Sequence, residues 1–145
     1  MGRESLHVLF FVLVSTLVSG YYYGLVDHAI VIPYMRSYYN PSLYPGDFLV
    51  AQAGYYYTFL WIILGFFTEV LGVPSTLVFF GVYLLSKFLV FYAVYLIAEL
   101  LFKRRVVSYL ALFFLIVNKA SLGGDDMFDA ILINRVPVLP FLFSR

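Results

Sequence analysis

The sequence predicts an all-α, polytopic membrane protein, with transmembrane helices and with amphipathic helices lying along the interface in the loops. Composition and long apolar runs support this fold class. Hydrophobic residues make up 63% of the 145 residues and charged residues only 12%, with a mean hydropathy of +0.95. Soluble domains carry about 25% charged residues, and a small soluble domain leaves much of its surface in water. A lipid bilayer is therefore the expected partner, and the expected location is the cell membrane, crossed several times.

Charge and residue content exclude several other classes. The formal net charge of +1 gives no basic surface, so nucleic acid is not an expected partner. The chain has no cysteine, which excludes disulfides, thiolate chemistry and Cys-based zinc sites. It also lacks a glycine-rich phosphate loop, a nucleophile elbow and a His-Glu-x-x-His motif.

The first apolar run, Leu6–Tyr23, follows Arg3 and Glu4. At about 1.5 Å per residue it nearly crosses a bilayer core of about 30 Å. A cleaved signal peptide is the alternative, because Ser19-Gly20 offers small residues after an apolar stretch. The tyrosine cluster Tyr21–Tyr23 favours a retained helix, because tyrosine anchors helices at the membrane interface.

A more polar stretch, residues 24–53, is expected to form a loop. Within it, Asp27–Tyr39 mixes apolar and polar residues around Pro33, which predicts a kinked helix lying in the interface. Turn signals at Asn40-Pro41 and Pro45-Gly46 indicate an ordered loop after that helix.

The rest of the chain is expected to belong to the same single membrane-embedded region, 1–145. Two further spans are predicted, 76–102 and 106–120, the second of them tilted. Segment 55–71 either spans or is re-entrant, and 121–135 forms a second loop. Residues 136–145 start another element, which is too short to cross a bilayer. The helical bundle is therefore expected to be incomplete.

Topology follows from the only compact basic cluster, Lys103-Arg104-Arg105, which the positive-inside rule places in the cytoplasm. The turn at 72–75 and the loop at 123–129 then lie outside. If Tyr55–Leu71 spans, Asp27 is cytoplasmic. If it does not, Asp27 lies outside, in the same compartment as Asp125 and Asp126. Composition leaves both solutions open.

Asp27 follows the first apolar segment directly. An acid at the mouth of a membrane segment can act as a general base or help to hold a divalent cation. The alternative is a helix N-cap, because aspartate accepts backbone N–H groups well at that position.

A second acidic group, Asp125, Asp126 and Asp129, has spacings that gather the carboxylates on one face of a helix. Such carboxylates repel one another unless a cation offsets them. The alternative is again capping, because acids in a first helical turn suit the helix dipole.

Two basic residues are candidates for a phosphate or lipid contact. Lys87 lies close to the midplane of the long span 76–102, where an ionisable residue is costly and therefore a functional candidate. Its alternatives are an ion pair with Glu69 or Glu99, or a side chain that reaches toward the interface. Arg135 precedes the last apolar segment and could meet an anionic head group, although arginine is common at interfaces.

The order of these features resembles a known family. Asp27-His-Ala-Ile-Val-Ile-Pro-Tyr-Met-Arg, followed by Asn40-Pro-Ser-Leu-Tyr-Pro-Gly-Asp47, is similar to the first outer loop of prokaryotic polytopic proteins that look like GT-C glycosyltransferases, which use polyprenyl-phosphate sugars. A long span ending in a basic turn matches Thr76–Arg105, and a second acidic outer loop matches Gly123-Gly-Asp-Asp126 and Asp129. The resemblance covers nearly all of this chain but only the N-terminal part of a typical member.

That resemblance implies a transferase that moves a sugar from a lipid-phosphate donor. Asp27 would be the catalytic base or would orient the acceptor. Asp125, Asp126 and Asp129 would hold a divalent cation, Mg²⁺ or Mn²⁺, or the donor phosphate, with Lys87 and Arg135 as phosphate partners. It also implies that Asp27 lies outside and that the 145-residue chain alone is inactive.

Two other classes stay open. In one, the chain is a small non-catalytic membrane subunit or scaffold, in which the acids are helix caps and the tyrosines are anchors. In the other, it is part of a transporter, with Lys87 and Glu99 lining a pathway. The sequence names no sugar, acceptor or oligomeric state.

Overall fold

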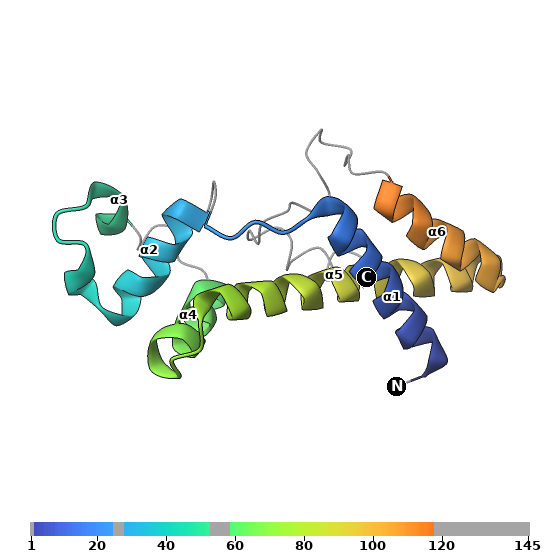
Figure 1. Cartoon of the computed structure of the whole chain (residues 1–145), viewed down its shortest axis with the longest axis horizontal. Helices are drawn as coiled ribbons and strands as arrows, with labels where there is room; N and C mark the ends of the chain where they lie inside the picture. The colour runs from blue at the N-terminus through green and yellow to red at the C-terminus, as the bar shows by residue number, and fades with distance from the viewer. Residues whose placement is uncertain (1, 25–27, 53–58, 118–145) are drawn as a thin grey trace. The chain divides into compact units, whose positions relative to one another are not determined.

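The computed structural model describes residues 2–24, 28–52 and 59–117, and every regular element in these ranges is helical. The all-α prediction is therefore confirmed for the described residues (Figure 1). The chain divides into two compact units. Unit 1 comprises Met1–Tyr21 and Val82–Arg145, and unit 2 comprises Tyr22–Gly81. Each unit is described by itself.

Unit 1 contains helix α1 (Arg3–Ser19), most of helix α5 (Ser75–Phe102) and helix α6 (Arg105–Val117). Helix α1 ends at Ser19, four residues before the end of the apolar run Leu6–Tyr23 that was predicted as a span. Gly20 adopts a positive φ of 74° and donates its N–H to Thr16 O at 2.9 Å. Glycine adopts this conformation without the steric penalty of a Cβ atom, so it closes the helix.

Helix α5 starts one residue before the predicted span and ends where the span was predicted to end. The chain reverses after it through Lys103, whose N–H reaches Glu99 O at 2.9 Å and whose φ is 51°. A left-handed residue at this point allows α6 to begin only two residues later. Residues 106–117 of the predicted span 106–120 are helical, and 118–120 lie outside the described residues.

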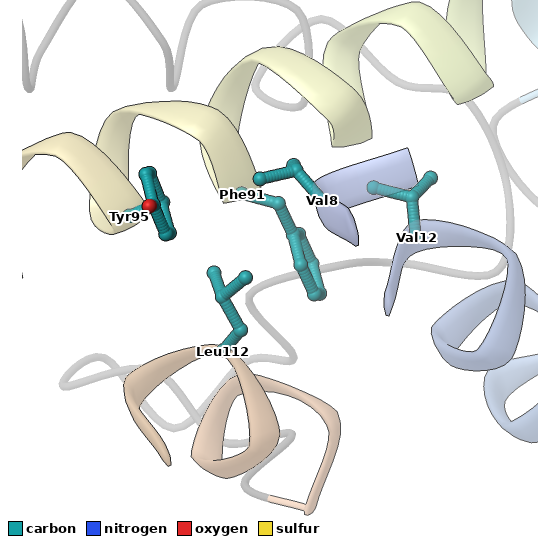
Figure 2. Packing of buried hydrophobic residues seen from close by; sticks show 5 residues of the cluster. All are labelled: Val8, Val12, Phe91, Tyr95 and Leu112. Atoms are coloured by element: carbon teal, nitrogen blue, oxygen red, sulfur yellow. The ribbon is translucent and has the colours of Figure 1, made fainter. Parts of the chain in front are cut away.

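The core of unit 1 forms where α1, α5 and α6 meet. It consists of five buried side chains from the three helices, shown in Figure 2: Val8, Val12, Phe91, Tyr95 and Leu112. Phe11 stacks on Tyr109 with the two rings nearly parallel, at 7°. Burial of these apolar side chains holds the three helices together.

Unit 2 contains helix α2 (His28–Tyr39), the 3₁₀ turn η1 (Pro41–Leu43), helix α3 (Phe48–Ala51) and helix α4 (Phe59–Gly65). A π-helical turn, η3 (Phe66–Val70), continues α4, and the first turns of α5 complete the unit. A helix predicted around Pro33 is present as α2, and its interfacial position stays a prediction. The ordered loop after it is also present, with the Asn40 side chain capping η1 and the Asp47 Oδ1 accepting the Val50 N–H at 3.1 Å.

Helices α2 and α4 approach closely at Gly65. A Cβ atom placed on Gly65 would lie 2.5 Å from Tyr39 Cε2 and 3.1 Å from Met35 Cγ. Tyr39 cannot easily move away, because its hydroxyl donates to Ile62 O at 2.7 Å. The absence of a side chain at position 65 therefore permits this contact.

Candidate functional site

Most residues of the predicted site lie outside the described residues. These are the candidate base Asp27, the three acids Asp125, Asp126 and Asp129, and Arg135. Among the residues that the structure does describe, no three His, Asp or Glu side chains converge on a metal position. The Mg²⁺ or Mn²⁺ site thus stays a prediction.

His28, the residue after Asp27, is fully buried in unit 2. Its Nδ1 accepts the Gly24 N–H at 3.1 Å, and its ring packs edge-on against Phe79 with centroids 5.0 Å apart. Tyr23 lies against the same imidazole and its hydroxyl is 2.6 Å from Ser75 Oγ. These contacts hold Tyr23, Gly24 and His28 together within unit 2.

Lys87 is the one predicted site residue that the structure describes, and its side chain is 0% exposed. It lies near the middle of α5, about 18 Å along the helix from Ser75 at the usual rise per residue. Its Nζ donates to Ser19 Oγ at 2.9 Å and to the Tyr83 hydroxyl at 3.0 Å. Nζ also lies 5.1 Å from the centre of the Tyr83 ring, within the range of a cation–π contact.

The lysine belongs to a short chain of hydrogen bonds between α5 and α1. Ser19 Oγ accepts from Lys87 and donates to Ser15 O at 2.8 Å. The ring of Tyr21 packs on Tyr83 with centroids 4.9 Å apart. Hydrogen bonds in series strengthen one another in an environment without water. The arrangement ties the end of α1 to the middle of α5.

The sequence offered Lys87 an ion pair with Glu69 or Glu99, or a contact with a lipid phosphate. Of its two predicted partners, Glu99 accepts from Ser108 Oγ at 3.0 Å, and Glu69 lies 3.3 Å from Arg36 Nε. The amine is directed at hydroxyl groups inside unit 1. The phosphate contact of Lys87 stays a prediction.

In unit 2 the Arg36–Glu69 pair is electrostatic and not a well-aligned hydrogen bond. Arg36 Nε is 3.3 Å from Glu69 Oε1 but has no hydrogen-bond partner of correct geometry. The two side chains are 43% and 28% exposed, and pairs of this kind add about 0–1 kcal/mol to stability. The pair connects α2 to η3.

Comparisons with protein-family models, with curated proteins and with solved structures find no match to this chain.

Sequence reasoning missed the polar end of unit 1, where α1 begins and α5 meets α6. Arg105 pairs with Glu4 at 3.2 Å, and the Tyr109 hydroxyl lies 3.1 Å from His7 Nδ1. These partners are about 100 residues apart in sequence. Only the opposite charges of Glu4 and the basic cluster could have suggested the pairing.

Proposed function

We propose that this chain is a multi-pass integral membrane protein that takes part in sugar transfer from a lipid-phosphate donor, in the manner of GT-C glycosyltransferases. Helix α5 is the observation that supports the membrane location. It is the one helix in the described ranges that is long and apolar enough to cross a bilayer by itself, with 28 residues. Only 33% of its most apolar window is buried.

The exposed side of α5 supports a lipid-facing role. Leu85, Leu89, Leu96 and Leu100 are exposed and recur at helical spacing on one face. Other large apolar side chains of α5 are exposed as well: Leu77, Ile97, Leu101 and Phe102. A helix that is hydrophobic on all sides is typical of a membrane span. In water this face would be an apolar patch of the kind that soluble monomers rarely expose.

The transferase part rests on the order of residues along the chain. Asp27 comes after a helix of 17 residues and directly before α2, whose first residue, His28, is held by Tyr23, Gly24 and Phe79. An acid that follows a membrane segment directly in the sequence suits a base that orients an acceptor hydroxyl. Asp125, Asp126 and Asp129 supply a cation site that would offset the phosphate charge.

The decisive experiment compares Asp27→Asn with Asp47→Asn in the full-length gene product, in its own membranes. Undecaprenyl phosphate carrying tritiated mannose, glucose or galactose serves as donor, one at a time, with Mg²⁺ or Mn²⁺. We expect the wild-type protein to transfer label from one donor, and Asp27→Asn to lower the rate by at least about 100-fold, as loss of a general base does.

Asp47→Asn is the matched control, because Asp47 lies in the same predicted loop but its carboxylate caps α3. Its transfer rate should stay within a few-fold of wild type. Full activity of Asp27→Asn, or no transfer of label from any of the donors by the wild-type protein, would overturn the proposal.

A non-catalytic membrane subunit is the second candidate. It is favoured by the internal use of polar groups: Lys87 ties α5 to α1, His28 anchors α2, and Asp47 caps α3. In that case the wild-type membranes leave every donor unchanged, while the protein remains in the bilayer after alkaline carbonate extraction. The transporter interpretation gains no support from Lys87, whose amine is enclosed.

A further inference from the structure

An apolar groove runs between α1 and α6 within unit 1. Its volume is about 560 Å³, and its walls are formed by Phe10, Val14 and Val18 on one side and by Phe113, Ile116 and Val117 on the other. No charged side chain lines it. The groove therefore suits a hydrocarbon chain.

One end of this groove points toward a surplus of positive charge. The Arg105–Glu4 pair shows that the start of α1 and the start of α6 lie together. This end carries four basic side chains, Arg3, Lys103, Arg104 and Arg105, against the two acids Glu4 and Glu99. The four basic residues are exposed, so a phosphate in the surrounding medium can reach them.

The distance between the basic residues and the apolar groove matches the distance between the phosphate and the upper acyl chain of a lipid. Phe10 lies six residues after Glu4 and Phe113 eight residues after Arg105, which corresponds to about 9–12 Å along the helices. The head-group layer on each side of a bilayer is about 5–8 Å thick. A lipid whose phosphate contacts the basic end would therefore place the upper part of its acyl chain at the mouth of the groove.

We propose that unit 1 binds an anionic phospholipid, with one acyl chain in the α1–α6 groove and the phosphate at Arg104 and Arg105. The proposal rests on the proposed membrane location but not on the transferase activity. Charge complementarity selects an anionic over a zwitterionic lipid. A second protein chain is a poorer occupant, because a stable protein interface buries about 1,200–2,000 Å², far more than this narrow groove offers.

Tryptophan fluorescence tests the proposal. Trp61 is the only tryptophan, so Trp61→Phe removes all native tryptophan fluorescence from the full chain. Phe113→Trp places the reporter in the groove wall, and Phe114→Trp places it on the neighbouring exposed position of α6 that does not line the groove. Each variant is reconstituted in vesicles with a low fraction of phosphatidylglycerol or phosphatidylcholine brominated on the acyl chains.

We expect brominated phosphatidylglycerol to quench Phe113→Trp more strongly than brominated phosphatidylcholine does. At Phe114→Trp the two lipids should quench equally. A contribution of about 1 kcal/mol per basic residue corresponds to a preference of about fivefold or more for the anionic lipid. Replacing Arg104 and Arg105 by glutamine should abolish this preference, whereas Arg36→Gln in unit 2 should leave it unchanged. Phe10→Trp repeats the measurement from the opposite wall.

The remaining outcomes overturn the proposal in distinguishable ways. Equal preference at the two reporter positions, or a preference that survives both arginine replacements, shows ordinary contact with bulk lipid. Displacement of the brominated phosphatidylglycerol by a small fraction of undecaprenyl phosphate assigns the groove to a polyprenyl lipid instead. If neither reporter is quenched by either lipid, the membrane location fails together with the lipid site.

Discussion

At the scale of single residues, Lys87 is held by two hydroxyl oxygens in the apolar interior of unit 1. Burial of an amine is unfavourable unless its N–H groups find acceptors. Ser19 and Tyr83 provide two of them. Tyr83 lies one turn before Lys87, so the Lys87–Tyr83 contact is made within α5. The Lys87–Ser19 contact requires α1 to pack against α5. The hydrogen bond to Ser19 therefore links the packing of α1 to the solvation of Lys87.

Replacement of Ser19 by alanine should lower the free energy of unfolding by about 1–3 kcal/mol, because it leaves one N–H of a buried amine without its acceptor. Thr16→Ala is the matched control. Like Ser19, Thr16 donates its hydroxyl to the carbonyl four residues earlier, at 2.9 Å from Val12 O. The measurement is SDS-induced unfolding in detergent micelles, followed by circular dichroism.

A Lys87→Met background tests the cause of this difference. Methionine keeps much of the side-chain length and removes the amine, so Ser19→Ala should cost no more than Thr16→Ala in that background. An equal cost of Ser19→Ala with and without the lysine would show that the Lys87–Ser19 bond does not stabilise the fold.

At the scale of elements, the success of sequence reasoning depended on how local each signal was. Helix α5 was predicted within one residue at its start, because Pro74 precedes a long apolar run and charged residues follow it. The end of α1 was not, because an apolar run does not show where Gly20 turns the backbone. The close contact between Gly65 and Tyr39 was also hidden, since it joins two helices separated in sequence.

The same limit applies to the candidate site. Lys87 could be singled out as a buried ionisable residue, but its partners could not be identified. Ser19 is 68 residues away in sequence, and hydroxyl groups give no signal comparable to an opposite charge. The contacts of His28 were missed because a single histidine has no spacing pattern.

Two glycines that differ only in their surroundings give an element-scale prediction. Gly65→Ala should destabilise unit 2 by about 1–3 kcal/mol, because the new methyl group overlaps Tyr39 in a packed interface. Gly81→Ala should stabilise α5 by up to about 1 kcal/mol, because its Cβ meets no atom within 4 Å and alanine is the better helix former.

Thermal unfolding in detergent compares both variants with the wild type. Opposite signs are expected for the two substitutions. A destabilisation of similar size at both positions would indicate that the approach of α2 to α4 is not specified by Gly65.

At the scale of the whole molecule, helix length bears on the proposed crossing of a bilayer. Helix α5 is long enough to span alone, whereas the apolar helices Phe59–Val70 and Arg105–Val117 are shorter in the described residues. At about 1.5 Å per residue, 12 residues cover about 18 Å of a core of about 30 Å. The described residues of α4 and η3 alone therefore do not reach across the core.

Because the chain contains no cysteine, single cysteines report its topology without a background. Thr76→Cys and Arg104→Cys mark the two ends of α5, and both positions are exposed. A membrane-impermeant maleimide should label Thr76→Cys in intact cells. It should label Arg104→Cys only after permeabilisation, because the basic cluster favours the cytoplasmic side. Labelling of both from the same side would show that α5 does not span.

Leu43→Cys then distinguishes the two topologies, because Leu43 is exposed in the turn between α2 and α3. If Phe59–Val70 does not cross the bilayer, Leu43→Cys is labelled from outside, like Thr76→Cys, and we expect this result. Asp27, which precedes the same segment, would then share a compartment with the loop that carries Asp125 and Asp126, as a sugar transfer between these groups requires. Labelling only after permeabilisation would place Asp27 in the cytoplasm, away from those acids, and the shared site could not form.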